Sequence, residues 1–236
     1  MTDVLSDEVA RFVRAAGPAP DDTLREMDEY AAEAGFPHVG PEVGGTLTLL
    51  ARMTGARIVF EFGSGYGYSA YWFSRALPDD GRIVLTEIDE DELEMAREYM
   101  RTGGFEELAE YELGDALEIV DRYDGPFDLV LLDHQKRRYP EAFDAVRSKV
   151  PVGGAIVADN AMTAGSIQFE TVLEILETSD RDPDRRDADL TADVPNDATD
   201  ATRGIATYLA TVRDDPAFET IVLPIGEGIA VSYRTE

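Results

Sequence analysis

Two short polar segments carry residue types that could do chemistry. The segment DHQK (133–136) follows the apolar run LVLL, and Asp159-Asn160 follows the run AIVA. Two carboxylates, from Asp133 and Asp159, and one amide carbonyl form an incomplete shell of oxygen ligands. Such a shell suits Mg2+ with open positions for water or substrate, and it lacks the imidazole or thiolate that Zn2+ favours. Lys136 could then take a proton from a substrate hydroxyl, which an arginine could not do because it does not deprotonate.

A glycine-rich turn stands earlier in the chain. Glu61 precedes the turn Gly63-Ser64-Gly65-Tyr66-Gly67, and Glu87 ends the next apolar run. Glycines at a strand-to-helix junction let the backbone turn sharply and approach a ligand closely. The spacing is not the dinucleotide fingerprint G-x-G-x-x-G, because the last position falls on Tyr68. A carboxylate at Glu87 would accept both hydroxyls of a ribose.

The elements that must position these residues follow from the hydrophobic pattern. From Arg57 onward, β-branched runs alternate with amphipathic segments, which predicts an α/β fold with a mostly parallel, doubly wound sheet and helices on both faces. The turn IGEG near the end predicts a closing antiparallel hairpin. Residues up to about 54 are helical in pattern, with Val4, Val9, Phe12 and Val13 on one face. The seven predicted strands cover residues 58–62, 83–88, 111–113, 128–133, 155–159, 219–224 and 228–234.

The chain reads as one domain, residues 1–236. We predict an N-terminal helical cap over residues 1–54 and a core over residues 55–236. Helices are expected near residues 167–177 and 204–212. Between them, residues 179–200 are acidic and hold almost no large apolar side chain, which predicts a mobile surface loop.

Composition excludes several classes of protein. With 44% hydrophobic residues a sizeable core can form, and the absence of cysteine removes disulfides and thiolate chemistry. No signal peptide or membrane span is evident, so a cytoplasmic protein is expected. A net charge of -28 argues against nucleic acid as a ligand. The acids are spread along the whole chain and 19 of the 21 basic residues are arginine, a pattern that resembles proteins of salt-loving archaea.

The glycine turn and the strand-end acids resemble those of the class I S-adenosylmethionine-dependent methyltransferases, which have a Rossmann-like fold. The resemblance implies that Glu87 holds the ribose, that the glycine turn accommodates the methionine part, and that Asp115 lies at the adenine. Taken singly, Asp115 could equally be a helix N-cap. The implied cofactor-binding set is Val39, Glu61, Gly63, Ser64, Gly65, Tyr68, Ser69, Glu87, Asp115, Ala116 and Asp133.

The segments FDLVLLDHQKRRYPEAF and GGAIVADN are similar to catechol O-methyltransferase and its cation-dependent relatives, including caffeoyl-CoA O-methyltransferases. This implies Mg2+ at Asp133, Asp159 and Asn160, with Lys136 as the base and Lys136 and Asn160 at the substrate. The acceptor would be a small molecule with vicinal hydroxyls. Two departures stand out. Gln135 occupies the place of a tryptophan, and an ungapped reading puts Ala230 where the catechol enzyme has an acceptor-binding glutamate.

Other readings stay open at this point. Asp133 could cap a turn, and Asp159-Asn160 could form an Asx turn. His134 is interpreted as a flanking polar residue or cofactor contact, and Arg138 as a solvated or paired surface group. The alternatives for function are a metal-independent methyltransferase acting on another nucleophile, a nicotinamide-dependent oxidoreductase, and a non-catalytic protein that retains the cofactor pocket. A homodimer is one option for the oligomeric state.

Overall fold

The chain folds around a seven-stranded sheet, seen in a computed structural model that describes residues 4–179, 195 and 197–236. The strand order is β3-β2-β1-β4-β5-β7-β6. β7 runs antiparallel to both β5 and β6, and the other neighbours pair in parallel. The predicted α/β architecture with its closing hairpin is therefore confirmed. The strands are β1 (Ile58–Phe62), β2 (Arg82–Glu87), β3 (Ala109–Leu113), β4 (Leu129–Leu132), β5 (Ala155–Ala158), β6 (Phe218–Leu223) and β7 (Ile229–Arg234).

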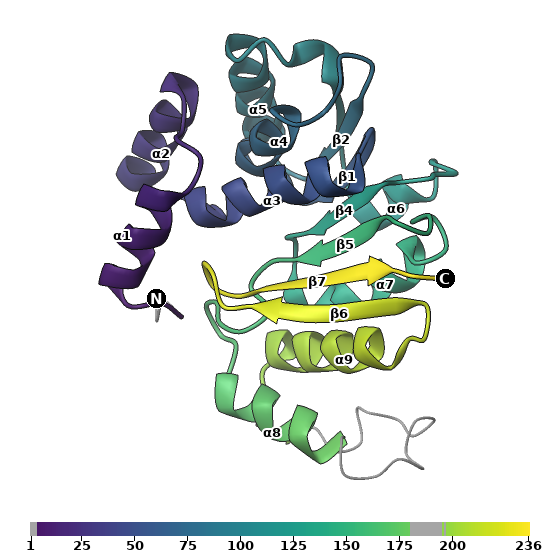
Figure 1. Ribbon diagram of the computed structural model, residues 1–236. Coiled ribbons are helices and arrows are strands. Elements are labelled where there is room, and N and C mark those ends of the chain that lie inside the picture. Colours follow the sequence, from purple (N-terminus) through teal and green to yellow (C-terminus); the bar gives the residue numbers. More distant parts are fainter. Residues whose placement is uncertain (1–3, 180–194, 196) are drawn as a thin grey trace.

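Helices connect the parallel strands and precede the sheet. Figure 1 shows the yellow β6–β7 hairpin at one edge of the sheet with α9 beside it, and α1 and α2 away from the strands. The helices are α1 (Asp7–Ala16), α2 (Asp22–Ala34), α3 (Gly40–Thr54), α4 (Tyr68–Ser74), α5 (Glu90–Thr102), α6 (Ala116–Val120), α7 (Tyr139–Val146), α8 (Phe169–Ser179) and α9 (Asp200–Asp214), with short 3-10 turns η1 (Glu106–Leu108) and η2 (Lys136–Arg138).

Both faces of the sheet are buried at its central strands β1, β2, β4 and β5. Val59 of β1 packs into one apolar cluster with residues of α2 to α5, including Trp72. Its neighbour Phe60 points to the other face, where it joins residues of α6 to α9 such as Phe143. Burial on two faces explains why the parallel strands read as continuous apolar runs rather than as an alternation.

The register of β1, β4 and β5 brings the polar segments together. Phe62 is level with Leu132, and Leu132 is level with Ala158. The pairing continues one residue beyond the strands, because Asp133 N donates to Phe62 O at 2.9 Å and Asp159 N donates to Leu132 O at 3.0 Å. The residues that follow the three strands therefore lie side by side at the carboxyl edge of the sheet.

The terminal helices differ in detail from the sequence prediction. The helix expected at residues 204–212 begins at Asp200, because the Thr199 side chain accepts a hydrogen bond from Thr202 N and caps it. α1 begins at Asp7, after Val4, and the Phe12 side chain is 73% exposed. The face that carries Phe12 is thus not a core face in this chain.

The structure does not test two of the predictions made from the sequence. Most of the acidic loop at residues 179–200 lies outside the described residues. The division into a cap and a core stays a prediction. Across the parts of the chain that the structure describes, no helix combines the length and apolarity needed to cross a bilayer.

Candidate active site

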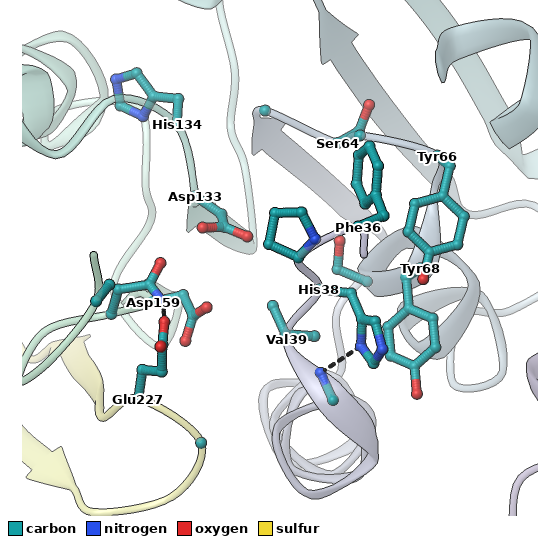
Figure 2. A pocket seen from close by; sticks show the side chains of 18 of the residues that line it. Phe36, His38, Val39, Ser64, Tyr66, Tyr68, Asp133, His134, Asp159 and Glu227 are labelled. Atoms are coloured by element: carbon teal, nitrogen blue, oxygen red, sulfur yellow. Dashed lines mark hydrogen bonds between the residues drawn. The ribbon is translucent and has the colours of Figure 1, made fainter. Parts of the chain in front are cut away.

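One cavity of about 1030 Å³ lies over the carboxyl edge of the sheet. It is large enough for a nucleoside-sized cofactor together with a small second molecule. Figure 2 shows Asp133, Asp159 and Glu227 on one side of this pocket and Phe36, His38 and Tyr68 on the other. The predicted residues that line it are Val39, Gly63, Ser64, Gly65, Tyr68, Ser69, Glu87, Asp115, Ala116, Asp133, Lys136, Asp159 and Asn160.

The glycine turn packs directly against the end of β4. Gly63 has φ +82°, and a Cβ there would lie 2.8 Å from the Asp133 carbonyl oxygen. A side chain at this position would therefore push the turn away from the segment that carries Asp133. The turn is also tied to β2, since Ser64 N donates to Thr86 O at 3.0 Å.

Backbone amides from two segments fix the Glu87 carboxylate. Gly65 N donates to Glu87 Oε2 at 2.9 Å, and Ile88 N donates to Oε1 at 2.7 Å. Asp89 N donates a second, longer bond to Oε1 at 3.3 Å, so the free capacity for ligand hydroxyls lies chiefly on Oε2, which accepts one bond. The geometry suits the predicted binding of a ribose diol at the end of β2.

Glu61 is buried beneath the turn and is the one predicted cofactor residue that does not line the cavity. Neither of its carboxyl oxygens has a hydrogen-bond partner among the described residues. The pKa of Glu61 is raised to about 8, mainly because the carboxyl is buried. The charge of Asp133 adds to this rise, and the nearby Ser69 hydroxyl opposes it. A buried carboxyl without a partner is a costly feature that a cationic group of a ligand would satisfy.

The predicted oxygen ligands and the lysine converge in the cavity. Lys136 Nζ lies 2.8 Å from Asp133 Oδ1, and both side chains are largely shielded from solvent. Asp159 is 4% exposed, and its Oδ1 has no partner among the described residues. Burial raises the pKa of Asp159, the charge of Asp133 raises it further, and Lys136 lowers it. The repulsion between the Asp133 and Asp159 carboxylates would be relieved by a cation between them.

The structure adds Glu227, a residue that the sequence reading missed. Asn160 Nδ2 donates a 2.6 Å hydrogen bond to Glu227 Oε2, and Glu227 lines the cavity. The ungapped reading had pointed to Ala230, which is buried in β7 instead. The available signal was an acid between Gly226 and Gly228 at the tip of a predicted hairpin.

Asp115 acts as a helix cap, the structural role that the sequence left open. Its Oδ1 accepts from Leu117 N at 2.9 Å, and its Oδ2 accepts from Arg138 Nη1 at 2.6 Å. The hydrogen bond from Arg138 is the main cause that lowers the pKa of Asp115. Arg138 is therefore a paired residue, as one reading of the sequence had it. Because Asp115 also lines the cavity, its predicted contact with an adenine stays a prediction.

His134 lies between Phe62 and Tyr139, with ring centroids 5.3 Å from each. Both ring nitrogens are buried without a partner among the described residues. The pKa of His134 is lowered to about 3, mainly because the ring is buried. The positive charges of Lys136 and Arg138 contribute to this fall. The imidazole is neutral near pH 7 and is not a proton donor there, which agrees with a non-catalytic reading.

An aromatic wall forms the opposite side of the cavity. The His38 and Tyr68 ring centroids are 4.4 Å apart, and Phe36 packs edge-on against Tyr66. The Tyr68 hydroxyl donates to Asp28 Oδ1 of α2 at 2.7 Å. Tyr68 thus offers its ring, rather than its hydroxyl, to a ligand in the cavity.

The donor set fits a small hard cation. Asp133, Asp159 and Asn160 could supply oxygen ligands, and Asp159 Oδ1 has no hydrogen-bond partner among the described residues. Within the described ranges, no group of three or more Asp, Glu, His or Cys side chains could hold a metal ion. The site therefore depends on the amide oxygen of Asn160 and on open positions for water or substrate, which is the arrangement that Mg2+ tolerates.

Comparisons with known proteins give the family of the chain. The family model described as O-methyltransferase matches residues 20–235. A catechol O-methyltransferase from Niastella koreensis is 33% identical over 181 residues, covering 74% of this chain and 81% of the relative. Tricin synthase 2 from Oryza sativa subsp. japonica is 27% identical and covers 92% of this chain and 70% of its own length. The O-methyltransferase TomG from Streptomyces achromogenes, solved in complex with SAM, superposes with a TM-score of 0.78 at 24% identity over 100% of both chains.

Proposed function

The chain belongs to the O-methyltransferase family, and from this premise we propose that it moves a methyl group from S-adenosylmethionine to a hydroxyl of a small acceptor with vicinal hydroxyls, assisted by Mg2+. One observation carries the proposal. Lys136, Asp133 and Asp159 meet at the edge of a cavity that also holds the glycine turn and Glu87. The names of two relatives, a catechol O-methyltransferase and a tricin synthase, support a phenolic acceptor.

The cofactor would lie along the carboxyl edge of the sheet. Glu87 would accept the ribose hydroxyls with a carboxylate already fixed by Gly65 N and Ile88 N. The Glu61 carboxyl is buried beneath the turn that would hold the methionine part, and the positive charge of the amino end would favour the ionised form of Glu61 from there. The solved relative TomG, which carries SAM, supports this choice of cofactor.

The divalent cation would be held by Asp133, Asp159 and Asn160. When bound, it would lower the pKa of a substrate hydroxyl and hold both hydroxyls of the acceptor in place. Its charge would also stabilise the ionised form of Asp159, which burial and Asp133 disfavour. The chemistry of the donor set is the support for Mg2+ in this proposal.

The positive charges of the divalent cation and of the cofactor sulfonium would favour the neutral amine of Lys136 before the reaction. This neutral amine would accept the proton of the acceptor hydroxyl. The oxygen then forms a bond to the methyl carbon in line with the sulfur, the carbon–sulfur bond breaks, and S-adenosylhomocysteine leaves. The proton stays on Lys136 Nζ as an ammonium, which Asp133 Oδ1 stabilises from 2.8 Å. Positioning by the rigid strand ends would supply much of the rate, because both reactants are held at one edge of the sheet.

Isothermal titration calorimetry in molar KCl tests the proposal. S-adenosylhomocysteine is added first, then Mg2+, then 3,4-dihydroxybenzoate. We expect the cofactor product to bind and the catechol to bind only after the metal. Cofactor binding without a metal-dependent catechol response would keep the methyltransferase and discard either the metal or the acceptor class.

The charge pattern supports a second part of the proposal, adaptation to high salt. The net charge of -28 is distributed along the whole chain, and exposed acids such as Asp80, Glu94 and Glu98 each pair with an arginine. Such exposed pairs contribute little stability singly. Screening by salt would therefore be needed to hold the compact state.

A further inference from the structure

Glu227 and Asn160 come from distant parts of the chain and meet in the cavity. Asn160 follows β5, and Glu227 lies 67 residues later in the turn between β6 and β7. The 2.6 Å bond runs from the amide nitrogen of Asn160 to a carboxylate oxygen of Glu227. A charge-assisted hydrogen bond of this length in a shielded site is a strong one.

The backbone of the turn fixes where the Glu227 carboxylate lies. Ala161 N donates to Gly228 O at 2.7 Å, and Thr163 N donates to Glu227 O at 2.9 Å. Gly228 approaches the same segment so closely that a Cβ there would lie 2.4 Å from Met162 Cγ. The β6–β7 turn is therefore attached to the segment after β5 through main-chain contacts, independently of the two side chains.

Asn160 itself has an unusual backbone. Its φ is +55°, the single positive value at a non-glycine residue in the described chain. Asparagine tolerates this region better than most residues. Its side-chain amide has a donor end and an acceptor end of almost the same shape, so either end could face the cavity unless a partner distinguishes them.

We propose that Glu227 is a positioning residue for a divalent cation: by holding the Asn160 amide nitrogen, it leaves the amide oxygen for the cation. The inference rests on the proposed metal-assisted function. Glu227 acts through Asn160 and need not touch the metal. Partners of this kind typically change metal affinity about 10-fold to 100-fold when they are removed.

An effect of Glu227 on metal affinity could also arise from its negative charge alone. A carboxylate near the site attracts a cation whichever way the amide points. Glu227→Asp separates the two accounts, because it keeps the charge and withdraws the carboxylate by about 1.5 Å, one carbon–carbon bond. Orientation requires the hydrogen bond, whereas general attraction does not.

The test is a calorimetric Mg2+ titration of the full-length protein with S-adenosylhomocysteine bound, in molar KCl. We expect Glu227→Asp and Glu227→Ala each to weaken Mg2+ binding about tenfold or more, with affinity for S-adenosylhomocysteine unchanged. Glu219→Gln, on exposed β6 surface, removes the same charge from the same hairpin and should leave Mg2+ binding unaltered. Wild-type affinity in Glu227→Asp would overturn the inference.

A reciprocal pair of substitutions supplies a rescue. Asn160→Asp with Glu227→Gln reverses donor and acceptor and conserves net charge. An oxygen still faces the cavity, now as part of a carboxylate, so we expect Mg2+ affinity at least equal to that of wild type. If the pair binds metal no better than Glu227→Ala, the positioning role is wrong. If wild-type protein binds S-adenosylhomocysteine but no Mg2+, the metal part of the proposed function fails and this inference fails with it.

Discussion

Lys136 Nζ lies 2.8 Å from Asp133 Oδ1, and the two residues are three positions apart at the end of β4. His134 and Gln135 connect them, and Lys136 is the first residue of the 3-10 turn η2. The pairing places the only lysine in the cavity beside one of the two acids proposed as ligands. The same short segment would therefore control both the position of the base and the position of the cation.

Replacing the base should abolish turnover while cofactor binding remains. Lys136→Ala is expected to lower kcat by about 10²- to 10⁴-fold, the range for loss of a general base. Affinity for S-adenosylhomocysteine should be unchanged, as measured by calorimetry. Arg137→Ala is the matched control, because the Arg137 side chain is exposed and does not line the cavity. Full activity in Lys136→Ala would exclude this residue as the base.

Replacing the proposed ribose acid should weaken cofactor binding. Glu87→Gln removes charge-assisted hydrogen bonds worth roughly 1.5–3 kcal/mol, so the Kd for S-adenosylhomocysteine should rise about 10-fold or more. Glu90→Gln removes the same charge from an exposed position at the start of α5 and should bind normally. Equal affinities in the two variants would place the ribose elsewhere.

A small substitution at Gly204 of α9 should displace the proposed base, Lys136. A Cβ at Gly204 would lie 2.3 Å from Lys136 O and 2.5 Å from Arg137 Cα. Gly204→Ala must therefore displace η2, at a cost of about 1–3 kcal/mol for overpacking. We expect kcat to fall with little change in cofactor affinity. Thr207→Ala, one turn later on the same helix, is the control, and an unaltered kcat in Gly204→Ala would show that η2 does not position Lys136.

The stability of the ligand-free protein should fall as pH rises from about 4.5 to about 8. Unfolded Glu61 loses its proton near its ordinary pKa of 4.5, while burial raises the folded pKa to about 8. The folded state then binds more protons over this window, so the free energy of unfolding decreases with pH and levels off above it. Glu61→Gln should reduce the slope of this part of the curve, to which Asp159 and Glu92 also contribute through their raised pKa values, whereas exposed Glu219→Gln should not.

Chemical denaturation at pH 5, 6.5 and 8 in molar KCl measures the effect. The free energy of unfolding of the wild type should approach that of Glu61→Gln at pH 5 and lie below it at pH 8. Parallel curves for the two proteins across the window would mean that Glu61 ionises normally in the folded state.

Removal of salt should unfold the chain. The Debye length grows from about 3 Å at 1 M salt to about 10 Å at 0.1 M, and a net charge of -28 then repels itself across the surface. We expect the circular dichroism signal of the helices to decrease on dialysis from molar KCl to low salt and to recover on return. A spectrum unchanged by dialysis would reject adaptation to high salt.

The order of the elements and the residue types that meet in the cavity follow from the sequence pattern. Apolar runs such as Ile58–Phe62 and Leu129–Leu132 are local signals, and each is followed by its polar or glycine segment. Since parallel strands all end at one edge, the neighbourhood of Gly63, Asp133 and Asp159 follows from the pattern without coordinates.

The hydrogen-bond partners and the burial of the site residues depend on tertiary packing. Glu227 reaches Asn160 because β7 returns antiparallel beside β5, and no local pattern encodes a contact across 67 residues. The same holds for the pairing of Arg138 with Asp115 and for the raised pKa of Glu61, which depend on what packs around each side chain. Hydrophobic periodicity fixes the strands and their ends, but hydrogen-bond partners and burial are properties of the packed chain.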